Sequence, residues 1–448
     1  MKLVDRSALK FILRVFVSAR VALSAWTFAL ALLAPTVLQN LDLFGAPTLA
    51  VFDLQSSERF AYSRALDDRV LTFRAGARGE VVDAETGSVW NLRAGRAEQG
   101  ALAGRAFAPA AFSVEEIFPY HGVAPETNLW LALWQRFDAN YYVSIAVRGY
   151  AATNGDTHFP PAYPILIRWF ALGGNYYLGG FVISNLACAL ALGLFYRQCA
   201  AAFDDQVARR ATIYLIIFPT AFFFFSAYTE SLFLVAALLT LRALERHAWG
   251  WAGWWIFCAI LIRLQGVALL IPLAYGIWQD RAREKIAARL VALGLPLVAL
   301  GLFLLVRIAA GESAVVPTSE PNLFARLALP WENYFYAIQT VLSGKFIAID
   351  ALNFGITTLC IIALISGWKK LSRPVALYAA ASLIVVTMRV VETQPLNSMV
   401  RYALTMFPLF MLMGEWGKHA WINRAIVYGS FALGLYLSAQ FVMWGWVG

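Results

Sequence analysis

The sequence has few charged residues and few cysteines. Only 14% of its 448 residues are Asp, Glu, Lys or Arg, whereas soluble domains carry about 25%. Apolar residues make up 60% before glycine is counted, so a soluble protein with one globular core is excluded. The four cysteines form no CxxC pair and no His-rich cluster, which excludes a disulfide framework and a cysteine-ligated metal. No cluster of acidic ligands stands out, so we predict neither a divalent metal nor another cofactor.

Long apolar runs make up most of the chain. Runs of about 18 to 25 apolar residues recur, and they predict an all-α polytopic membrane protein with about eleven transmembrane helices. The first run is longer than the apolar part of a signal peptide and lacks a convincing cleavage site, so we expect an uncleaved first span. The predicted spans are 11–38, 176–196, 210–227, 231–246, 249–263, 266–279, 290–308, 351–367, 372–390, 402–416 and 424–446.

The basic residues are concentrated in alternate loops. The formal net charge is +9, but the lysines and arginines lie in short clusters between apolar runs, which is the positive-inside pattern and not that of a nucleic-acid-binding protein. This pattern predicts a cytoplasmic N-terminus and an outer C-terminus. The outer connections then hold the polar residues closest to membrane depth, where charge is costly and usually functional. These residues are Asp138, His158, Glu230, Arg263, Gln265, Glu392 and Arg401.

The polar part of the chain lies between the first and second spans. Turn signals such as Glu85-Thr-Gly separate short β-prone runs, which predicts a small β-rich extracytoplasmic insert. Apolar positions at helical spacing over 128–148 predict a helix on the membrane surface, and 159–175 carries three prolines and is interpreted as an interfacial or re-entrant helix. The expected parts are a first transmembrane span (1–40), the insert (41–127), interfacial helices (128–175), a transmembrane module (176–308), an outer loop (309–350) and a C-terminal transmembrane module (351–448).

Several short motifs in these outer segments occur together. They are Arg136-Phe-Asp-Ala-Asn-Tyr-Tyr, His158-Phe-Pro-Pro-Ala-Tyr-Pro, Tyr228-Thr-Glu-Ser-Leu-Phe, Arg263-Leu-Gln-Gly and Arg401-Tyr-Ala-Leu. As an ordered set they resemble the bacterial relatives of the second mannosyltransferase of glycosylphosphatidylinositol-anchor assembly, within the GT-C superfamily of membrane glycosyltransferases. Phenylalanine stands at 137 where that family more often has tryptophan, and the insert is extra. Within the insert, Asp83-Ala-Glu-Thr-Gly-Ser-Val-Trp resembles part of a bacterial secreted domain of unknown function.

The resemblance implies a GT-C fold and an inverting hexosyl transfer, with mannose as the implied sugar. The donor would be a sugar on polyprenyl phosphate, the acceptor a lipid, glycan or protein, and the place the outer face of the bacterial plasma (inner) membrane. Asp138 would be the base.

Elementary chemistry agrees with this role. An acceptor hydroxyl needs a positioned carboxylate to take its proton, and a leaving phosphate needs fixed cations. Arg263 and Arg401 are the candidate phosphate ligands, with Arg136 or His158 in support. The remaining candidate substrate-binding residues are Tyr163, Glu230 and Gln265.

Each candidate also has a purely structural interpretation. Asp138 can cap a helix or pair with Arg136, Glu230 can pair with Arg263, and Arg401 can extend to the outer head groups. His158 can satisfy a loop carbonyl, and Tyr163 can belong to the aromatic belt at the membrane interface.

Two other functions fit the same composition. A transporter or flippase of lipid-linked sugars would place polar residues on both sides of the membrane midplane and often show inverted repeats. The predicted polar set is one-sided, and no repeat is evident. A binding or scaffold protein with a degenerate enzyme behind its insert would have lost Asp138 or Arg401, and both are present.

Overall fold

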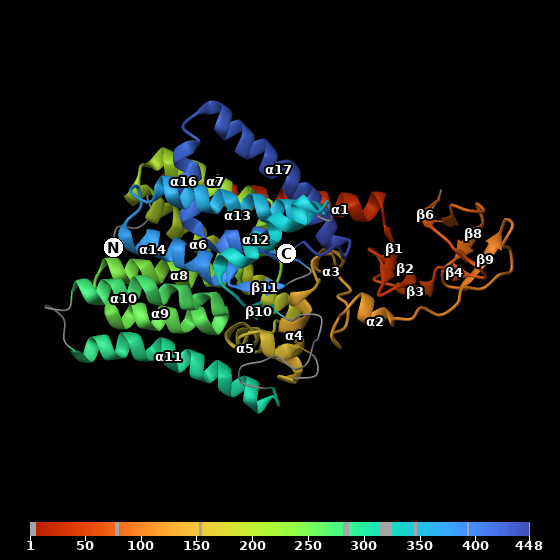
Figure 1. Cartoon of the computed structure of the whole chain (residues 1–448), viewed down its shortest axis with the longest axis horizontal. Coiled ribbons are helices and arrows are strands. Elements are labelled where there is room, and N and C mark those ends of the chain that lie inside the picture. The colour runs from red at the N-terminus through yellow and green to blue at the C-terminus, as the bar shows by residue number, and fades with distance from the viewer. Residues whose placement is uncertain are drawn as a thin grey trace. The chain divides into compact units, whose positions relative to one another are not determined.

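The chain is mostly helical, with a few small sheets (Figure 1). The computed structural model describes residues 6–76, 80–151, 155–280, 286–312, 325–344, 347–391 and 394–447. Glu392 and three basic residues of the predicted cytoplasmic loop at 281–285 lie outside the described residues. The chain forms two compact units. The helical unit comprises Met1–Leu23, Tyr141–Ser438 and Val447–Gly448, and the insert unit comprises Ser24–Asn140 and Ala439–Trp446.

Three helices belong partly to each unit, and the others belong to one. The shared helices are α1 (Arg6–Leu33), α4 (Asp138–Arg148) and α17 (Ala420–Val442). The helical unit contains α5 (Ala162–Trp169), α6 (Tyr176–Ala202), α7 (Asp205–Ile217), α8 (Glu230–Glu245), α9 (Trp249–Ile262), α10 (Leu270–Gln279), α11 (Ile286–Ala309), α12 (Pro330–Leu342), α13 (Ala348–Gly367), α14 (Arg373–Thr387), α15 (Met399–Tyr402) and α16 (Phe407–Trp416). Short 3₁₀ turns are η3 (Asp156–His158), η4 (Ala221–Phe224), η5 (Leu264–Leu269) and η7 (Ala403–Thr405), and strands β10 (Ala325–Leu327) and β11 (Arg389–Val391) pair antiparallel.

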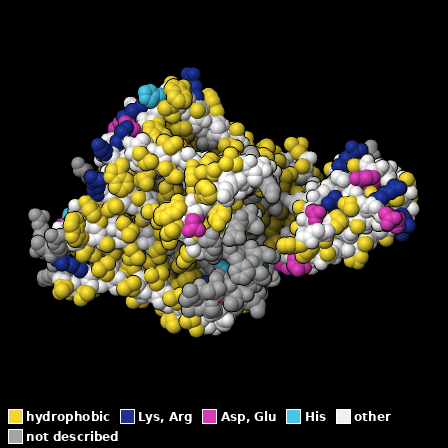
Figure 2. Space-filling view, in the orientation of Figure 1, with side chains coloured by type: hydrophobic (Ala, Val, Ile, Leu, Met, Phe, Trp, Pro, Cys, Tyr) yellow, Lys and Arg dark blue, Asp and Glu magenta, His cyan; other side chains and the backbone are white. Residues whose placement is uncertain are grey.

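Among the described residues, five helices are long and apolar enough to cross a membrane: α1, α6, α11, α13 and α17. Their outer faces carry exposed leucines, for example Leu290, Leu297 and Leu305 along α11. Figure 2 shows hydrophobic side chains over most of the visible face of the helical unit. Such a surface is far more apolar than a soluble monomer exposes and indicates a membrane protein.

The other helices of the helical unit are shorter, because several predicted spans are interrupted. The span expected at 210–227 ends as α7 at Ile217, since Pro219 has no N–H to donate and restricts the residue before it. The chain continues as η4. In the same way 266–279 divides into η5 and α10, and 402–416 into η7 and α16. Continuous helices over these three ranges were therefore wrong.

Close packing in the helical unit depends on small residues. Helix α9 packs against α8 and α11. A Cβ atom on Gly253 would lie 2.7 Å from the carbonyl oxygen of Ala292 in α11, so the α9–α11 approach requires glycine.

The insert unit is β-rich, as its sequence predicted. A three-stranded antiparallel sheet contains β1 (Thr36–Leu43), β2 (Ala46–Asp53) and β3 (Arg59–Ser63), and a four-stranded sheet contains β6 (Phe73–Ala75), β7 (Val81–Asp83), β8 (Val89–Asn91) and β9 (Arg96–Gln99). The strands β4 (Ala65–Leu66) and β5 (Arg69–Val70) pair with each other. Buried residues at the centre include Leu49, Val51, Phe73 and Trp90.

The insert begins earlier than the sequence indicated. Helix α1 ends at Leu33 before Pro35, and β1 begins at Thr36, so the predicted first span 11–38 and the boundary at 40 lay too far along the chain. The outer loop expected at 309–350 contains the amphipathic helix α12, which starts at Pro330. Its Asn333 donates hydrogen bonds to the carbonyls of Thr387 and Arg389 and fixes α12 beside β11.

The surface helix predicted over 128–148 is two helices. Helix α3 (Leu129–Ala132) is capped by the side chain of Asn128, and α4 begins only at Asp138. Phe137 between them has φ +51°, a left-handed conformation that interrupts the helix. The re-entrant segment expected at 159–175 contains the eight-residue helix α5.

Candidate active site

Helix breaks in the helical unit carry most of the candidate polar residues. Glu230 is the first residue of α8, and residues 225–229 connect it to η4. Arg263 is extended (φ −151°, ψ 134°) between α9 and η5, and Arg401 lies in the single turn α15 before η7. η5 turns back against the end of α9 at Gly266, where a Cβ would lie 2.6 Å from the nitrogen of Ile260. Interrupted helices expose backbone groups, and proteins keep them at membrane depth only where protein or a polar cavity satisfies those groups.

The three charged side chains meet on one carboxylate oxygen. Oε1 of Glu230 accepts a hydrogen bond from Nη1 of Arg263 at 2.6 Å and another from Nε of Arg401. Nη1 of Arg263 also donates to Oγ1 of Thr229 at 2.9 Å. Glu230 is fully buried, and the two arginine side chains are 10% and 7% exposed. Two arginines thus share one buried carboxylate oxygen. We call Glu230, Arg263 and Arg401 the arginine–glutamate cluster.

Aromatic rings enclose this cluster. The guanidinium of Arg401 lies 4.8 Å from the ring centre of Phe223 and 4.7 Å from that of Tyr228. The guanidinium of Arg263 lies 5.3 Å from the ring centre of Tyr402. Ring faces stabilise a cation and keep it desolvated, which strengthens its attraction for an anion.

The cluster keeps unused hydrogen-bonding capacity. Oε2 of Glu230 and Nε2 of Gln265 are buried and have no partner among the described residues. Oε1 of Gln265 accepts a bond from Oγ1 of Thr405 at 3.0 Å. Within the same described part of the chain, Nε and Nη2 of Arg263 donate to no acceptor. Because buried polar groups are normally paired, this arrangement can still bind a polar or anionic group.

Asp138 belongs to the insert unit and is partly exposed. It begins α4, and the backbone around it is fixed by the turn bonds Ala139 N–H to Arg136 O and Asn140 N–H to Phe137 O. Nδ2 of Asn140 donates to the carbonyl of Pro119 at 3.1 Å. A carboxylate that is partly exposed on a rigid helix start has the access that a general base requires.

Arg136 has a different environment from the predicted one. It is 1% exposed, and it donates to the carbonyls of Val442 (2.9 Å), Ala132 (2.6 Å) and Gln135 (3.0 Å). These bonds tie backbone segments together inside the insert unit. They favour a structural role for Arg136 over substrate contact.

Tyr163 and His158 also bind backbone. The hydroxyl of Tyr163, fully buried, donates to the carbonyl of Gly180 at 2.9 Å, and it lies 2.7 Å from Oγ of Ser184. Nδ1 of His158 lies 3.0 Å from the carbonyl of Gly155, so the interpretation as a loop contact describes its position. Tyr163 thus packs α5 on α6 and does not lie in an interface belt.

Sequence reasoning missed several members of the cluster. Thr229, Tyr228, Thr405 and Tyr402 all contact it, and all four lie one to four residues from a candidate charge. Tyr228, Thr229 and Tyr402 lie inside the quoted motifs and Thr405 directly follows one of them, which was the available signal. Tyr142 of α4 joins the same network, with its hydroxyl 3.3 Å from Oγ1 of Thr229.

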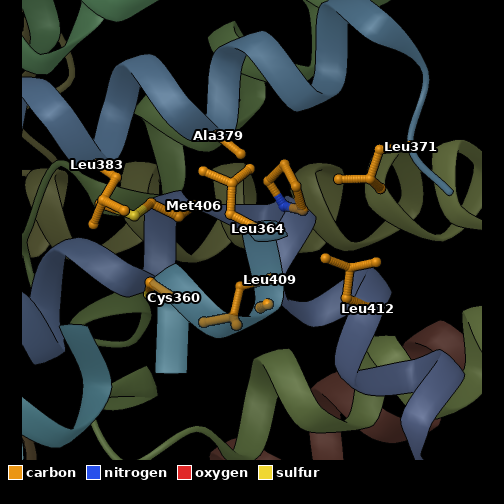
Figure 3. A pocket seen from close by; sticks show the side chains of 10 residues that line it. Cys360, Leu364, Leu371, Ala379, Leu383, Met406, Leu409 and Leu412 are labelled. Carbon is orange, nitrogen blue, oxygen red and sulfur yellow. The ribbon is translucent and has the colours of Figure 1, made fainter. Parts of the chain in front are cut away.

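The apolar pocket in Figure 3 lies apart from this chemistry. Side chains of α13, α14 and the start of α16 line it, among them Cys360, Leu364, Leu383, Met406 and Leu412. Its lining contains neither a carboxylate nor a cation, so it offers no base and no phosphate ligand. Among the described residues no group of three or more His, Cys, Asp or Glu could hold a metal ion.

Fold and site together define a helical membrane protein with a buried, arginine-rich polar cluster at its helix breaks. Comparisons with protein-family models, with curated proteins and with solved structures find no match to this chain.

Proposed function

We propose that this protein is a membrane glycosyltransferase of the GT-C type, resembling the bacterial relatives of the second mannosyltransferase of glycosylphosphatidylinositol-anchor assembly. It transfers a hexose, with mannose as the sugar that the resemblance implies, from polyprenyl phosphate to a lipid, glycan or protein acceptor. The reaction takes place on the outer face of a bacterial plasma membrane. The fold has about eleven spans in this proposal, with several crossings made by paired short helices.

The observation that carries the proposal is the arginine–glutamate cluster. A polyprenyl phosphate places an anion at the membrane surface, and its recognition requires fixed cations with free donors. Arg263 has two nitrogens without an acceptor among the described residues, and Arg401 lies beside it on the same carboxylate oxygen. Arginine binds phosphate oxygens through two parallel N–H groups. Glu230 holds the arginines in place, and Gln265 offers a further amide donor.

Asp138 supplies the base in this mechanism. It takes the proton of the acceptor hydroxyl while that oxygen forms a bond to the anomeric carbon of the sugar. The bond between that carbon and the phosphate oxygen breaks, and its electron pair leaves with the phosphate. Attack opposite the leaving group inverts the anomeric configuration. No general acid is needed, because the phosphate is already a stable anion that Arg263 and Arg401 neutralise.

The test is a transfer assay on the purified protein. The protein is incubated with a panel of radiolabelled polyprenyl-phosphate sugars, and the products are analysed by mass. We expect Asp138→Asn to insert and fold normally but to lose transfer. The matched control is Asp67→Asn, an exposed aspartate of the same unit, which retains full activity. Near-normal turnover by Asp138→Asn would refute the assignment of the base.

The proposal also requires Asp138 and Arg401 on the same side of the membrane. Two exposed residues provide labelling sites that leave the cluster intact. Thr127→Cys lies nine residues before Arg136, and Gln394→Cys lies seven residues before Arg401. Both should react with an impermeant thiol reagent from outside, and Lys369→Cys in a predicted cytoplasmic loop should not. Labelling of positions 127 and 394 from opposite sides would exclude a shared active site.

One observation keeps transport in view as the second candidate. Interrupted helices that hold charges near membrane depth also occur in transporters, where the breaks form the substrate site. A flippase would move a lipid-linked sugar from one leaflet of a liposome membrane to the other without releasing the sugar from its phosphate. Product formation that depends on Asp138 distinguishes the enzyme, because a flippase needs no base.

A further inference from the structure

Phe137 and Trp444 are among the residues of the insert unit that adopt the left-handed conformation, which L-amino acids disfavour. Phe137 has φ +51° and Trp444 has φ +61°. Bulky side chains are rare there, and such residues persist only where the surrounding contacts over-determine them. Phe137 directly precedes Asp138, the candidate base, and Trp444 lies two residues after the end of α17.

The two strained residues pack on each other. The ring centres of Phe137 and Trp444 are 5.4 Å apart at an interplanar angle of 69°. Phe137 also contacts Phe441 (5.6 Å) and Trp446 (5.1 Å). Phe137 is thus enclosed by three rings of the segment Phe441–Trp446, about 300 positions later in the chain. We call Phe441–Trp446 the tail segment.

Arg136 is fixed by the same segment. Nε donates to the carbonyl of Val442 at 2.9 Å, and the guanidinium lies between the rings of Phe52 and Trp444, at 4.8 and 5.0 Å from their centres. Both residues that precede Asp138 are therefore anchored by the tail segment. Since α4 starts immediately afterwards, the direction of its first turn follows from these anchors.

The insert in turn anchors the tail segment. The ring of Trp444 contacts Phe52 of β2 (5.7 Å), Phe118 (5.6 Å) and Tyr120 (5.3 Å). Nε2 of Gln39 in β1 donates to the carbonyl of Met443 at 3.1 Å. The β1–β2 hairpin, the tail segment and the Arg136-Phe-Asp motif thus form a continuous packed set.

We propose that the tail segment and the β1–β2 hairpin are a positioning device for Asp138. This inference rests on the proposed function, in which Asp138 is the base. Trp444 is its central positioning residue: it touches neither substrate nor the reacting atoms, but it holds Phe137 in the left-handed turn that starts α4 at Asp138. The insert is accordingly part of the catalytic scaffold and not only an added surface domain.

The test compares kcat and KM for the donor in Trp444 variants. Trp444→Ala should lower kcat by about 10²-fold, because a displacement of a reacting group by about 1 Å costs about that factor. KM for the donor should stay within about twofold, since the arginine–glutamate cluster binds the phosphate in our proposal. Trp444→Phe keeps a ring in place and should recover most of the rate. Trp421→Ala, at the first turn of α17 and therefore at the opposite end of that helix, is 72% exposed; it is the tryptophan control and should behave as wild type.

A second variant covers the case in which Trp444→Ala does not fold. Phe137→Gly adopts the left-handed turn without strain but lacks the ring, so it should lose kcat while the insert stays folded. Wild-type kcat in folded Trp444→Ala or Phe137→Gly, with Asp138→Asn inactive, would overturn this inference and leave the proposed function intact. Absence of sugar transfer by the wild type, or activity in Asp138→Asn, would instead refute the proposed function.

Discussion

Two fully buried carboxylates, Asp83 in the insert unit and Glu230 in the helical unit, are paired in opposite ways. Asp83 accepts four hydrogen bonds through both oxygens: from Thr86 N (2.6 Å), Thr86 Oγ1 (3.0 Å), Trp90 Nε1 (2.9 Å) and Ser88 N (3.2 Å). All its donors are neutral and lie within seven residues. Glu230 is bound through one oxygen by two arginines that are 33 and 171 positions away.

The difference separates a structural carboxylate from one in a candidate site. Asp83 closes the hairpin between β7 and β8, where Gly87 with φ +71° completes the turn, and its bonding capacity is used. The segment Asp83-Ala-Glu-Thr-Gly-Ser-Val-Trp therefore forms the turn between β7 and β8, and its Asp and Gly are required by the geometry of that turn. Around Glu230 two arginines share one oxygen, and the other oxygen has no partner among the described residues, nor has the nearby Nε2 of Gln265. Buried charges together with unmet hydrogen bonding indicate a place that binds something else.

The largest expected effect comes from removing the charge of Glu230. Glu230→Gln leaves two buried arginines without their anion, which should lower the free energy of unfolding by about 3 to 5 kcal/mol. Thermal unfolding of the purified protein in detergent measures this loss, and sugar transfer should be lost with it. The matched control is Glu58→Gln, whose pair with Arg93 is exposed. Equal melting temperatures for Glu230→Gln and wild type would contradict a buried ion cluster.

Asp83→Asn should have an intermediate effect, confined to the insert unit. The asparagine amide keeps one acceptor oxygen, but its NH₂ group faces N–H and O–H donors from which it cannot accept a hydrogen bond. We therefore expect the free energy of unfolding of the insert to fall by about 1.5 to 3 kcal/mol, the range for hydrogen bonds to charged groups. Limited proteolysis of the full chain measures the opening of the insert. Asp67→Asn, which changes an exposed aspartate, is the control.

Asp83 also predicts how stability depends on pH. Burial raises the pKa of its carboxyl, but the bonds from Trp90, Thr86 and Ser88 outweigh burial and lower the pKa from its ordinary value. The ionised group therefore stabilises the folded insert above the unfolded pKa of about 3.9, and this contribution is lost as the pH falls through the lowered pKa. Protease resistance of the wild-type insert should decline below about pH 4. A wild type and an Asp83→Asn variant that lose resistance equally over this range would contradict the assignment.

The sequence was informative where a signal is local. Apolar runs located helices near most of the predicted spans, and turn residues located the β-rich insert. The polar residues Glu230, Arg263, Gln265 and Arg401 could be grouped from the sequence, because the loops between predicted spans alternate sides and all four were predicted to lie on one side. The structure brings these four together, although the sequence left open whether Glu230 pairs with Arg263 or contacts substrate.

What could not be predicted depends on distant contacts. In the sequence, Arg136 was a candidate phosphate ligand near Asp138. In the structure its side chain is buried and donates to the carbonyl of Val442, 306 positions away. The left-handed turn at Phe137 has no sequence signal, since phenylalanine rarely adopts it and distant rings, with Trp444 among them, hold it there. Tyr163 is similar: its spacing fits an interface belt, and only tertiary packing shows its bond to Gly180.

The smallest effect should come from the exposed pair of Asp67 and Arg105, which completes the series from buried to exposed carboxylates. The side chains of Arg105 and Asp67 are 49% and 69% exposed, so water and salt screen their attraction, and each loses side-chain freedom on pairing. A double-mutant cycle with Asp67→Asn and Arg105→Gln, read by protease resistance of the insert, should give a coupling of about 0 to 1 kcal/mol that declines as salt is added. A coupling as large as the loss in Asp83→Asn would mean that exposure does not separate weak from strong pairs in this protein. The ranking Glu230, Asp83, Asp67 therefore tests whether burial and balance of charge, and not the number of ion pairs, determine which carboxylates matter.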